Sequence, residues 1–334
     1  MITRMLCIAG HLLASLAAAT LARAEGPIVI KFSHVTAPQA HKSLAAEKFK
    51  ELAEKALGGR IKIELYPNSQ LYKDKEEMEA LQLGAVQMLC PSLSKFGPLG
   101  IKDFEVFDLP YMFSSYEDVA KITQGPIGQE LLKKLETKGI KGLTYWNNGF
   151  KILSANQPLI SPDDMLGLKV RIQGSKVIEA QMLALGALPQ AMAFSEAYQA
   201  LSTGVVDGTE NTPANLYTQK MYEVQKHATL TNHAYLGYAV IANKKFWDGL
   251  PDDIRTTLEK ILIEVTPYAN DLAAKENAQS IEDVRKSGKT TIHEPTADEL
   301  KVWKEALMPV RKEMSGRVGA ELIRRFEEAI AKPK

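Results

Sequence analysis

The chain has 334 residues, of which 45% are hydrophobic and 24% are charged, and its formal net charge at pH 7 is +1. A chain of this length and composition can bury an ordinary apolar core and is expected to divide it between two domains. Its near-neutral, dispersed charge excludes a basic nucleic-acid-binding protein or a protein held on an anionic membrane surface.

The first 24 residues have the pattern of a secretory signal peptide. Arg4 supplies a positive charge, a largely apolar stretch runs from Met5 to Leu21, and residues 22–24 form the small-x-small motif that precedes cleavage. We therefore predict cleavage after Ala24 and a periplasmic mature protein. An uncleaved N-terminal anchor is the alternative.

Short β-prone runs alternate with amphipathic helices in the first half of the chain, which is typical of the α/β class. The predicted strands are residues 28–32, 61–65 and 143–147, and the predicted helices are 45–56, 76–83 and a segment from 127 that ends at Gly139.

A second set of α/β units begins near Gly149. Its predicted elements are a strand at 169–172, helices after Ser175 and Ser195, strands at 205–207 and 235–242, and a final helix from 297 to 329.

A long helical pattern runs from Asp252 to about Lys286. At ~1.5 Å per residue it would be roughly 50 Å long, which is longer than one small domain, so we expect it to span two. Pro267 lies inside it and should kink it, because proline lacks a backbone donor and contacts the preceding turn.

The common enzyme motifs are absent from the sequence. It contains no phosphate-binding loop, dinucleotide fingerprint, hydrolase nucleophile elbow or zinc-protease motif. None of the five histidines after residue 24 has zinc-ligand spacing to another ligand residue. Cys90 ends an apolar run and is interpreted as a small buried hydrophobe. We therefore expect no catalysis, no metal and no cofactor.

Arg171 is the most informative single residue. In the predicted strand, Val170 and Ile172 point to one face and Arg171 to the other. Its planar guanidinium can bind a carboxylate through two parallel hydrogen bonds. From the pattern alone, a surface arginine or a structural ion pair remains the alternative.

Eight segments along the chain carry a family resemblance: KFSHVTAP at 31–38, LYPNSQLYKDKEEMEALQLGAVQM at 65–88, PSLSKFGPLG at 91–100, FEVFDLPYMF at 104–113, YWNNGFK at 145–151, KVRIQGS at 169–175, GVVDGTENTP at 204–213 and NHAYLGYAV at 232–240. In this order they resemble the solute-binding proteins of tripartite ATP-independent periplasmic (TRAP) transporters, specifically the DctP-type branch that binds C4-dicarboxylates.

The resemblance implies an α/β periplasmic binding protein fold with two domains, a ligand cleft between them and a long kinked helix across the hinge. We expect domain I to contain residues 25–147 and 237–276, and domain II to contain residues 148–236 and 277–330.

The resemblance also implies one wall of the ligand site. Arg171 matches the family's carboxylate-binding arginine, and Asn211 matches its ligand-contacting asparagine. The Asn211 amide can donate to the same carboxylate while its carbonyl accepts from Arg171. Phe194 matches an aromatic residue of the pocket, although its local pattern alone favours a core residue.

The opposite wall is expected to contain Lys42 as a second cation and Ser92 as a hydroxyl donor. A solvated lysine at the start of a helix is the alternative for Lys42. The remaining expected site residues are Asn148 and Lys151 from the inter-domain crossing, and His34 and His233 at the border of the pocket. A solvated or backbone-bonded histidine is the alternative for each of the last two.

Two cationic walls favour a dicarboxylate, because each buried carboxylate needs its own compensation. We expect succinate, malate or fumarate as the ligand, TRAP permease subunits (one small, one large) as partners, and a monomer. The alternatives are the same fold binding a keto or aromatic acid, a periplasmic sensor subunit that presents its ligand to a receptor, and a periplasmic enzyme.

Overall fold

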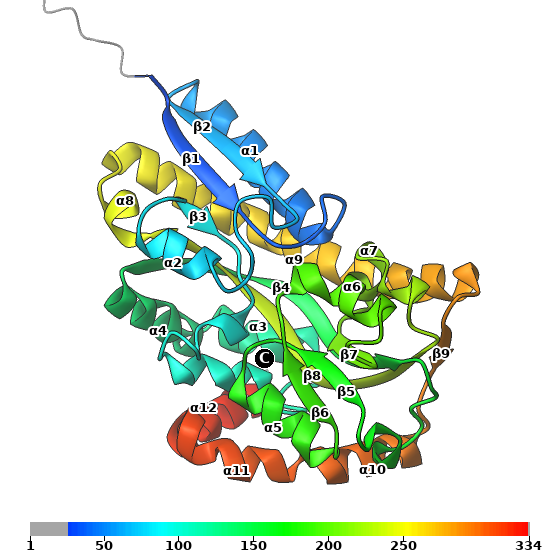
Figure 1. The fold of residues 1–334 in the computed structure, drawn as a ribbon. Coiled ribbons are helices and arrows are strands. Elements are labelled where there is room, and N and C mark those ends of the chain that lie inside the picture. Colours follow the sequence, from blue (N-terminus) through cyan, green and yellow to red (C-terminus); the bar gives the residue numbers. More distant parts are fainter. Residues whose placement is uncertain (1–25, 333–334) are drawn as a thin grey trace, which may run out of the picture.

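The computed structural model describes residues 26–332 (Figure 1). The predicted signal peptide and its cleavage after Ala24 lie outside this range. Within residues 26–332, no helix combines the length and apolar character needed to cross a membrane.

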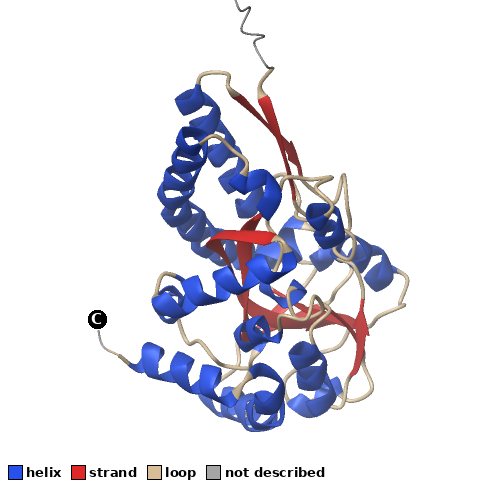
Figure 2. Ribbon diagram, turned by 90° about the vertical axis from the view of Figure 1, so that its left-hand side faces the viewer, coloured by secondary structure: helices blue, strands red, loops and turns tan. Residues whose placement is uncertain are grey.

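A mixed sheet runs through the molecule and is flanked by helices (Figure 2). Within the described residues it has nine strands in the order β2-β1-β3-β8-β4-β7-β5-β6, and β9 pairs with β8. The strands are β1 (Ile28–Ser33), β2 (Ile61–Tyr66), β3 (Met88–Leu89), β4 (Ile140–Ala155), β5 (Lys169–Ile172), β6 (Leu188–Ala191), β7 (Gly208–Asn211), β8 (His227–Asn243) and β9 (Thr291–His293).

The strands β4 and β8 join the two halves of this sheet. They pair antiparallel along nearly their whole length, from Ile140 opposite Asn243 to Ala155 opposite His227. At one end β8 also pairs with β3, and at the other end β4 pairs with β7. Each half is therefore a smaller sheet that shares the same two long central strands, and the predicted two-domain α/β fold is confirmed.

Helices cover both halves, and Figure 1 shows α1 at one end of the molecule and α10 to α12 at the other. The helices are α1 (His41–Leu57), α2 (Glu77–Gln82), α3 (Tyr116–Thr123), α4 (Pro126–Lys134), α5 (Lys176–Ala184), α6 (Ala197–Ser202), α7 (Pro213–Thr218), α8 (Lys244–Asp248), α9 (Asp252–Ser287), α10 (Ala297–Leu307), α11 (Pro309–Val318) and α12 (Ala320–Ala331), with short 3-10 helices that include η1 (Leu93–Lys95) and η2 (Lys102–Asp108).

The long helix α9 spans both halves, as predicted. It has 36 residues and continues through Pro267. Near its start, Leu258 packs in the core with α1 and β1, and near its end, Val284 packs in the core of the other half with Leu201 and Leu216. Pro267 cannot donate to the carbonyl of Ile263, which lies on the exposed side of the helix, where water can replace the missing bond.

Two predicted elements are wrong. Residues 205–207 form a turn rather than a strand, and the strand β7 begins at Gly208. The turn is fixed by the Asp207 carboxylate, which accepts from the Lys169 N–H, and by Gly204 at φ 72°. The single C-terminal helix predicted at 297–329 is three helices, because Pro309 starts a new one and Gly319 adopts φ 104°, outside the helical region.

Candidate functional site

A small cavity of about 20 Å³ lies where the two halves meet. Its lining comes from both halves and from the crossing strand β8: Val35, Thr36, Asp74, Ser92, Gln173, Phe194, Asn211, Asn215, Leu236 and Tyr238. Three of these, Ser92, Phe194 and Asn211, are residues that the sequence predicts for the site. Because both halves line the cavity, a guest enters or leaves it when the two halves separate.

Arg171 is fully buried next to this cavity, at 1% exposure. Strand β5 holds it between β6 and β7, and its Nη2 donates to the Met192 carbonyl at 2.9 Å. Its Cζ lies 5.5 Å from the centre of the Phe194 ring. Nε and Nη1 are buried and have no hydrogen-bond partner among the described residues. Burial lowers the pKa of this guanidinium, which is therefore a costly group that a carboxylate can satisfy.

Asn211 ends β7 and faces the same cavity. Its side-chain oxygen accepts from the Thr212 N–H at 2.9 Å and from Asn215 Nδ2 at 2.7 Å. The expected bond from Arg171 to this oxygen is not formed, because the turn into α7 supplies two nearer donors. These bonds fix the orientation of the Asn211 amide group.

Lys42 is buried rather than solvated, so the alternative interpretation of this residue is wrong. It lies in the first turn of α1 at 1% exposure, and its Nζ donates to the Cys90 carbonyl at 2.9 Å. The same Nζ lies 3.7 Å from the centre of the Tyr238 ring, and Tyr238 lines the cavity. Burial lowers the pKa of Lys42. The structure therefore places a second desolvated cation beside the cavity, in the half opposite Arg171.

Ser92 connects the two walls. Its hydroxyl shares a hydrogen bond with Ser94 at 2.9 Å and accepts from Gln173 Nε2 at 2.9 Å, across the cavity. Gln173 follows directly after β5, so this bond links the wall of Lys42 to the wall of Arg171.

Asn148 and Lys151 lie on β4, and their side chains bond to other side chains of the protein. Asn148 donates to the Tyr238 hydroxyl and accepts from Thr212 Oγ1 at 2.7 Å. Lys151 Nζ lies 2.7 Å from Glu210 Oε2, and both side chains are 1% exposed. Because Glu210 balances its charge, Lys151 is in a buried ion pair rather than a free cation for a ligand.

The two predicted histidines are buried and bonded to neighbouring threonines. His34 Nδ1 lies 3.2 Å from Thr36 Oγ1, and His233 Nδ1 lies 2.8 Å from Thr231 Oγ1. Burial lowers the pKa of His34 well below its usual value, and it lowers that of His233 to about 3. Both rings are therefore neutral at pH 7, and neither is among the residues that line the cavity.

Asp74 and Lys95 were missed by sequence reasoning. Asp74 lines the cavity at 5% exposure, and its Oδ1 lies 2.9 Å from Lys95 Nζ. Asp74 stands in the run KDKEE at 73–77, where a charged, solvated segment is the natural interpretation. The sequence contains no local signal that separates Asp74 from its exposed neighbours.

Comparison with known proteins gives consistent matches over most of the chain. The model of a family described as bacterial extracellular solute-binding protein, family 7 (DctP) matches residues 32–317. The C4-dicarboxylate-binding periplasmic protein DctP of Rhodobacter capsulatus is 62% identical over 333 residues, which cover 99% of this chain and 100% of that protein.

Solved structures agree with this match. A TRAP periplasmic solute binding protein from Shewanella oneidensis with bound succinate has a TM-score of 0.89 at 40% identity, over 91% of this chain and 99% of that chain. A protein of the same description from Pseudomonas aeruginosa with bound L-malate has a TM-score of 0.84 at 44% identity, over 86% of this chain and 100% of that chain.

Proposed function

This chain belongs to the bacterial extracellular solute-binding proteins of family 7, and from this membership we propose that it captures a C4-dicarboxylate in the periplasm and delivers it to a TRAP permease. The observation that carries the proposal is the buried guanidinium of Arg171, with two donors that no described residue satisfies. A ligand carboxylate can accept two parallel hydrogen bonds from one edge of this guanidinium.

The charges near the cavity favour a dianion over a monoanion. Lys42, Lys95 and Arg171 are cationic, and Asp74 is the carboxylate closest to Arg171. Glu77 is also buried nearby, and burial raises its pKa to about 8, so most of it is neutral at pH 7. Three cations against one ionised carboxylate leave two positive charges, which two ligand carboxylates balance.

The two walls also suggest how such a ligand is held. Arg171 and Asn211 would bind one carboxylate, with Phe194 against the carbon chain. Lys42 and Ser92 would bind the other, while Asn148, Lys151, His34 and His233 support the walls without contributing free charge. Succinate, malate and fumarate are the proposed ligands, in line with the bound acids of the two solved relatives.

The proposed domain boundaries follow the crossing strands. Domain I contains residues 25–147 and 237–276, and domain II contains residues 148–236 and 277–330. The exchange between domains within β4 and β8 supports this division. The helices α11 and α12 also pack against the aromatic core around Phe107, so the end of domain II contacts domain I.

The rest of the role follows from the family. We propose secretion with cleavage after Ala24, a monomeric state, small and large permease subunits as partners, and no chemical change to the ligand. The family is one of transport proteins rather than enzymes.

The test is a thermal-shift panel on protein expressed with its own N-terminal segment and purified from the periplasm. The panel contains succinate, malate, fumarate, keto acids, aromatic acids and sugar acids. A ligand at 100 times its dissociation constant adds ~2.7 kcal/mol of stability, which is easily measured as a raised melting temperature. Stabilisation by keto or aromatic monoacids alone would disprove the dicarboxylate assignment.

A further inference from the structure

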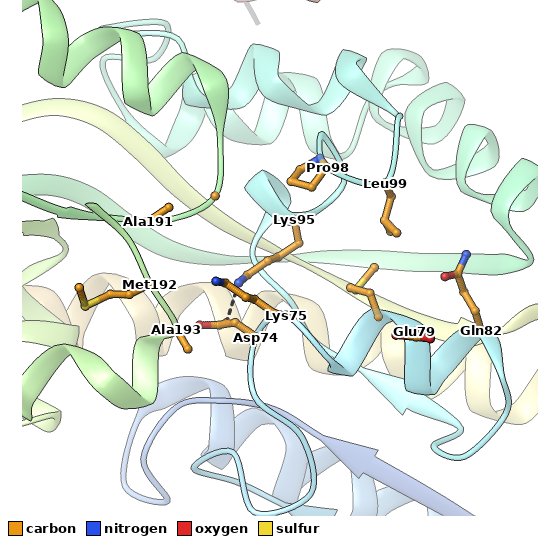
Figure 3. A pocket seen from close by; sticks show the side chains of 12 residues that line it. Asp74, Lys75, Glu79, Gln82, Lys95, Pro98, Leu99, Ala191, Met192 and Ala193 are labelled. Carbon is orange, nitrogen blue, oxygen red and sulfur yellow. Dashed lines mark ion pairs between the residues drawn. The ribbon is translucent and has the colours of Figure 1, made fainter. Parts of the chain in front are cut away.

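A second, larger hollow lies outside the ligand cavity. It has a volume of about 640 Å³ and is shown in Figure 3. One wall is built by residues between Asp74 and Leu99 of domain I, and the other by Gly174 and residues 191–193 of domain II. We call this hollow the outer pocket. Because its walls belong to different domains, it takes this shape only when the domains are closed.

Asp74 forms the partition between the outer pocket and the ligand cavity, since it lines both. Its Oδ1 is held by Lys95 Nζ at 2.9 Å, the ion pair drawn as a dashed line in Figure 3. Its Oδ2 accepts from the Phe194 N–H and lies 4.0 Å from Arg171 Nη2. One oxygen is thus fixed to domain I while the other contacts domain II.

These contacts keep the Asp74 carboxylate charged in spite of its burial. Burial acts to raise its pKa, but the nearby charges of Lys95 and Arg171 outweigh that effect and lower the pKa below its usual value. The bonds across the cleft are therefore charge-assisted, and such bonds are about twice as strong as neutral ones.

Two other contacts across the cleft near Asp74 are weaker. Lys73 and Glu196 form an ion pair at 2.9 Å with side chains 51% and 49% exposed, where solvent screens the interaction. Ser92 and Gln173 form a neutral hydrogen bond. Opening of the cleft leaves the Asp74–Lys95 pair intact and breaks the contacts of Asp74 with Phe194 and Arg171.

We propose that Asp74 is the latch that holds the two domains closed over the bound acid, and that its contacts with Phe194 and Arg171 set the rate at which the acid is released. The inference rests on the proposed function, since it assigns a positioning role within the same site. In this role Asp74 contacts domain II and not the ligand. Removing its charge should therefore change the rate of ligand release more than the rate of ligand capture.

The test compares release of radiolabelled succinate, chased with excess unlabelled succinate, from the parent and from Asp74→Asn. The substitution keeps the shape of the side chain and removes its charge. We expect release to become faster by about tenfold or more, with the association rate changed by less than about threefold. Lys95→Gln, which removes the anchor of the carboxylate, should accelerate release in the same direction.

Lys73→Gln is the matched control, because it breaks the exposed ion pair one residue away. Its release rate should stay within about twofold of the parent. Release from Asp74→Asn at the parent rate would overturn the proposal. Loss of succinate binding by Asp74→Asn with unchanged circular dichroism would also overturn it, because Asp74 would then be needed for capture.

A second measurement does not depend on the ligand. Spin labels on Glu51→Cys and Val205→Cys, which lie in opposite domains at exposed positions, report the distance between the domains. Asp74→Asn should increase the fraction of long distances. An unchanged distance distribution would contradict the latch. If the parent bound no dicarboxylate while this shift appeared, the proposed function would fail and the latch would stand.

Discussion

Arg171 and Lys42 are both buried cations, but their partners satisfy them to different degrees. Lys42 has a carbonyl and the face of an aromatic ring. Arg171 has one hydrogen-bonded carbonyl, the Phe194 ring and the Asp74 carboxylate at 4.0 Å, and its Nε and Nη1 have no hydrogen-bond partner among the described residues. An incompletely satisfied buried charge costs free energy in the folded protein. Arg171 therefore destabilises the unliganded protein and stabilises the complex with the ligand.

Arg171→Ala should therefore have opposite effects on binding and on stability. Affinity for succinate should fall by about 2–5 kcal/mol, the range for loss of one partner of a buried, hydrogen-bonded charge pair. The melting temperature of the unliganded protein should stay equal or rise, because an unsatisfied cation is removed. Titration calorimetry and thermal unfolding measure the two quantities.

Arg324→Ala is the control for loss of an arginine, since Arg324 is 56% exposed and pairs with carboxylates on its own helix. It should leave affinity unchanged. Binding by Arg171→Ala within about twofold of the parent would show that Arg171 is not the carboxylate anchor.

For single residues, the sequence predicts members of both walls where a family pattern marks them, and it misses Asp74, whose position depends on packing. The motifs that carry Arg171, Asn211 and Phe194 predict these residues for the site, and the structure places Asn211 and Phe194 at the cavity. Asp74 carries no such motif, because its burial depends on contact with Phe194, 120 residues away, while its immediate neighbours Lys73 and Lys75 in the same charged run are exposed. Asp74 differs from these neighbours in its tertiary contacts, which no local sequence pattern encodes.

The elements that join the domains are β4, β8 and α9, and Asn277 of α9 ties them together at the crossing. Its Nδ2 donates to the Asn148 carbonyl at 2.7 Å, and its Oδ1 accepts from the Ala214 N–H at 3.1 Å. Gly149, beside Asn148, leaves the space that this amide occupies. A Cβ on Gly149 would lie 2.7 Å from Asn277 Nδ2.

We therefore expect Gly149→Ala to destabilise the protein by about 1–3 kcal/mol, the usual cost of overpacking a filled site. The urea midpoint of unfolding should fall accordingly. Gly316→Ala in α11 is the matched control, because a Cβ there meets nothing within 4 Å and alanine is the better helix former. Equal midpoints for Gly149→Ala and the parent would mean that Asn277 moves aside without cost.

The sequence predicts the long elements well and the short ones poorly. The periodic pattern of α9 is so long that its predicted bounds, 252 and about 286, nearly match Asp252–Ser287. The strand predicted at 205–207 is wrong because two β-prone residues, Val205 and Val206, cannot outweigh the turn that Gly204 and Asp207 form. The single C-terminal helix failed because its amphipathic pattern continues across Pro309 and Gly319 although the backbone does not.

At the scale of the whole molecule, closure of the two domains buries charged groups from distant parts of the chain in one interior. Glu77 is among them: it is 1% exposed, and neither carboxylate oxygen has a hydrogen-bond partner among the described residues. Asp74, Lys95 and Lys42 are the charged groups that act on it, and burial has the largest effect. Its pKa is raised from 4.5 to about 8, so the folded protein holds a proton that the unfolded chain releases.

The difference between the Glu77 pKa values of the folded and unfolded states determines how the stability of the protein changes with pH. Between pH 4.5 and 8 the folded state binds one more proton at Glu77 than the unfolded state, so the free energy of unfolding decreases as the pH rises. The contribution of this group is fully present below pH 4.5 and is lost by about pH 8. Glu77→Gln keeps the neutral shape at every pH. It should therefore match the parent near pH 4.5 and exceed it in stability near pH 8.

Urea unfolding at a series of pH values measures the difference in the free energy of unfolding between Glu77→Gln and the parent. The comparison with Glu77→Gln is needed because burial also raises the pKa of Asp108, to about 7, which gives the parent a second slope of the same sign. That slope is common to both proteins and cancels in their difference. A gap that widens by up to about 1 kcal/mol per pH unit within this window assigns the effect to Glu77. Parallel curves would mean that Glu77 is ionised in the closed protein, which would leave one positive charge fewer to balance a dicarboxylate.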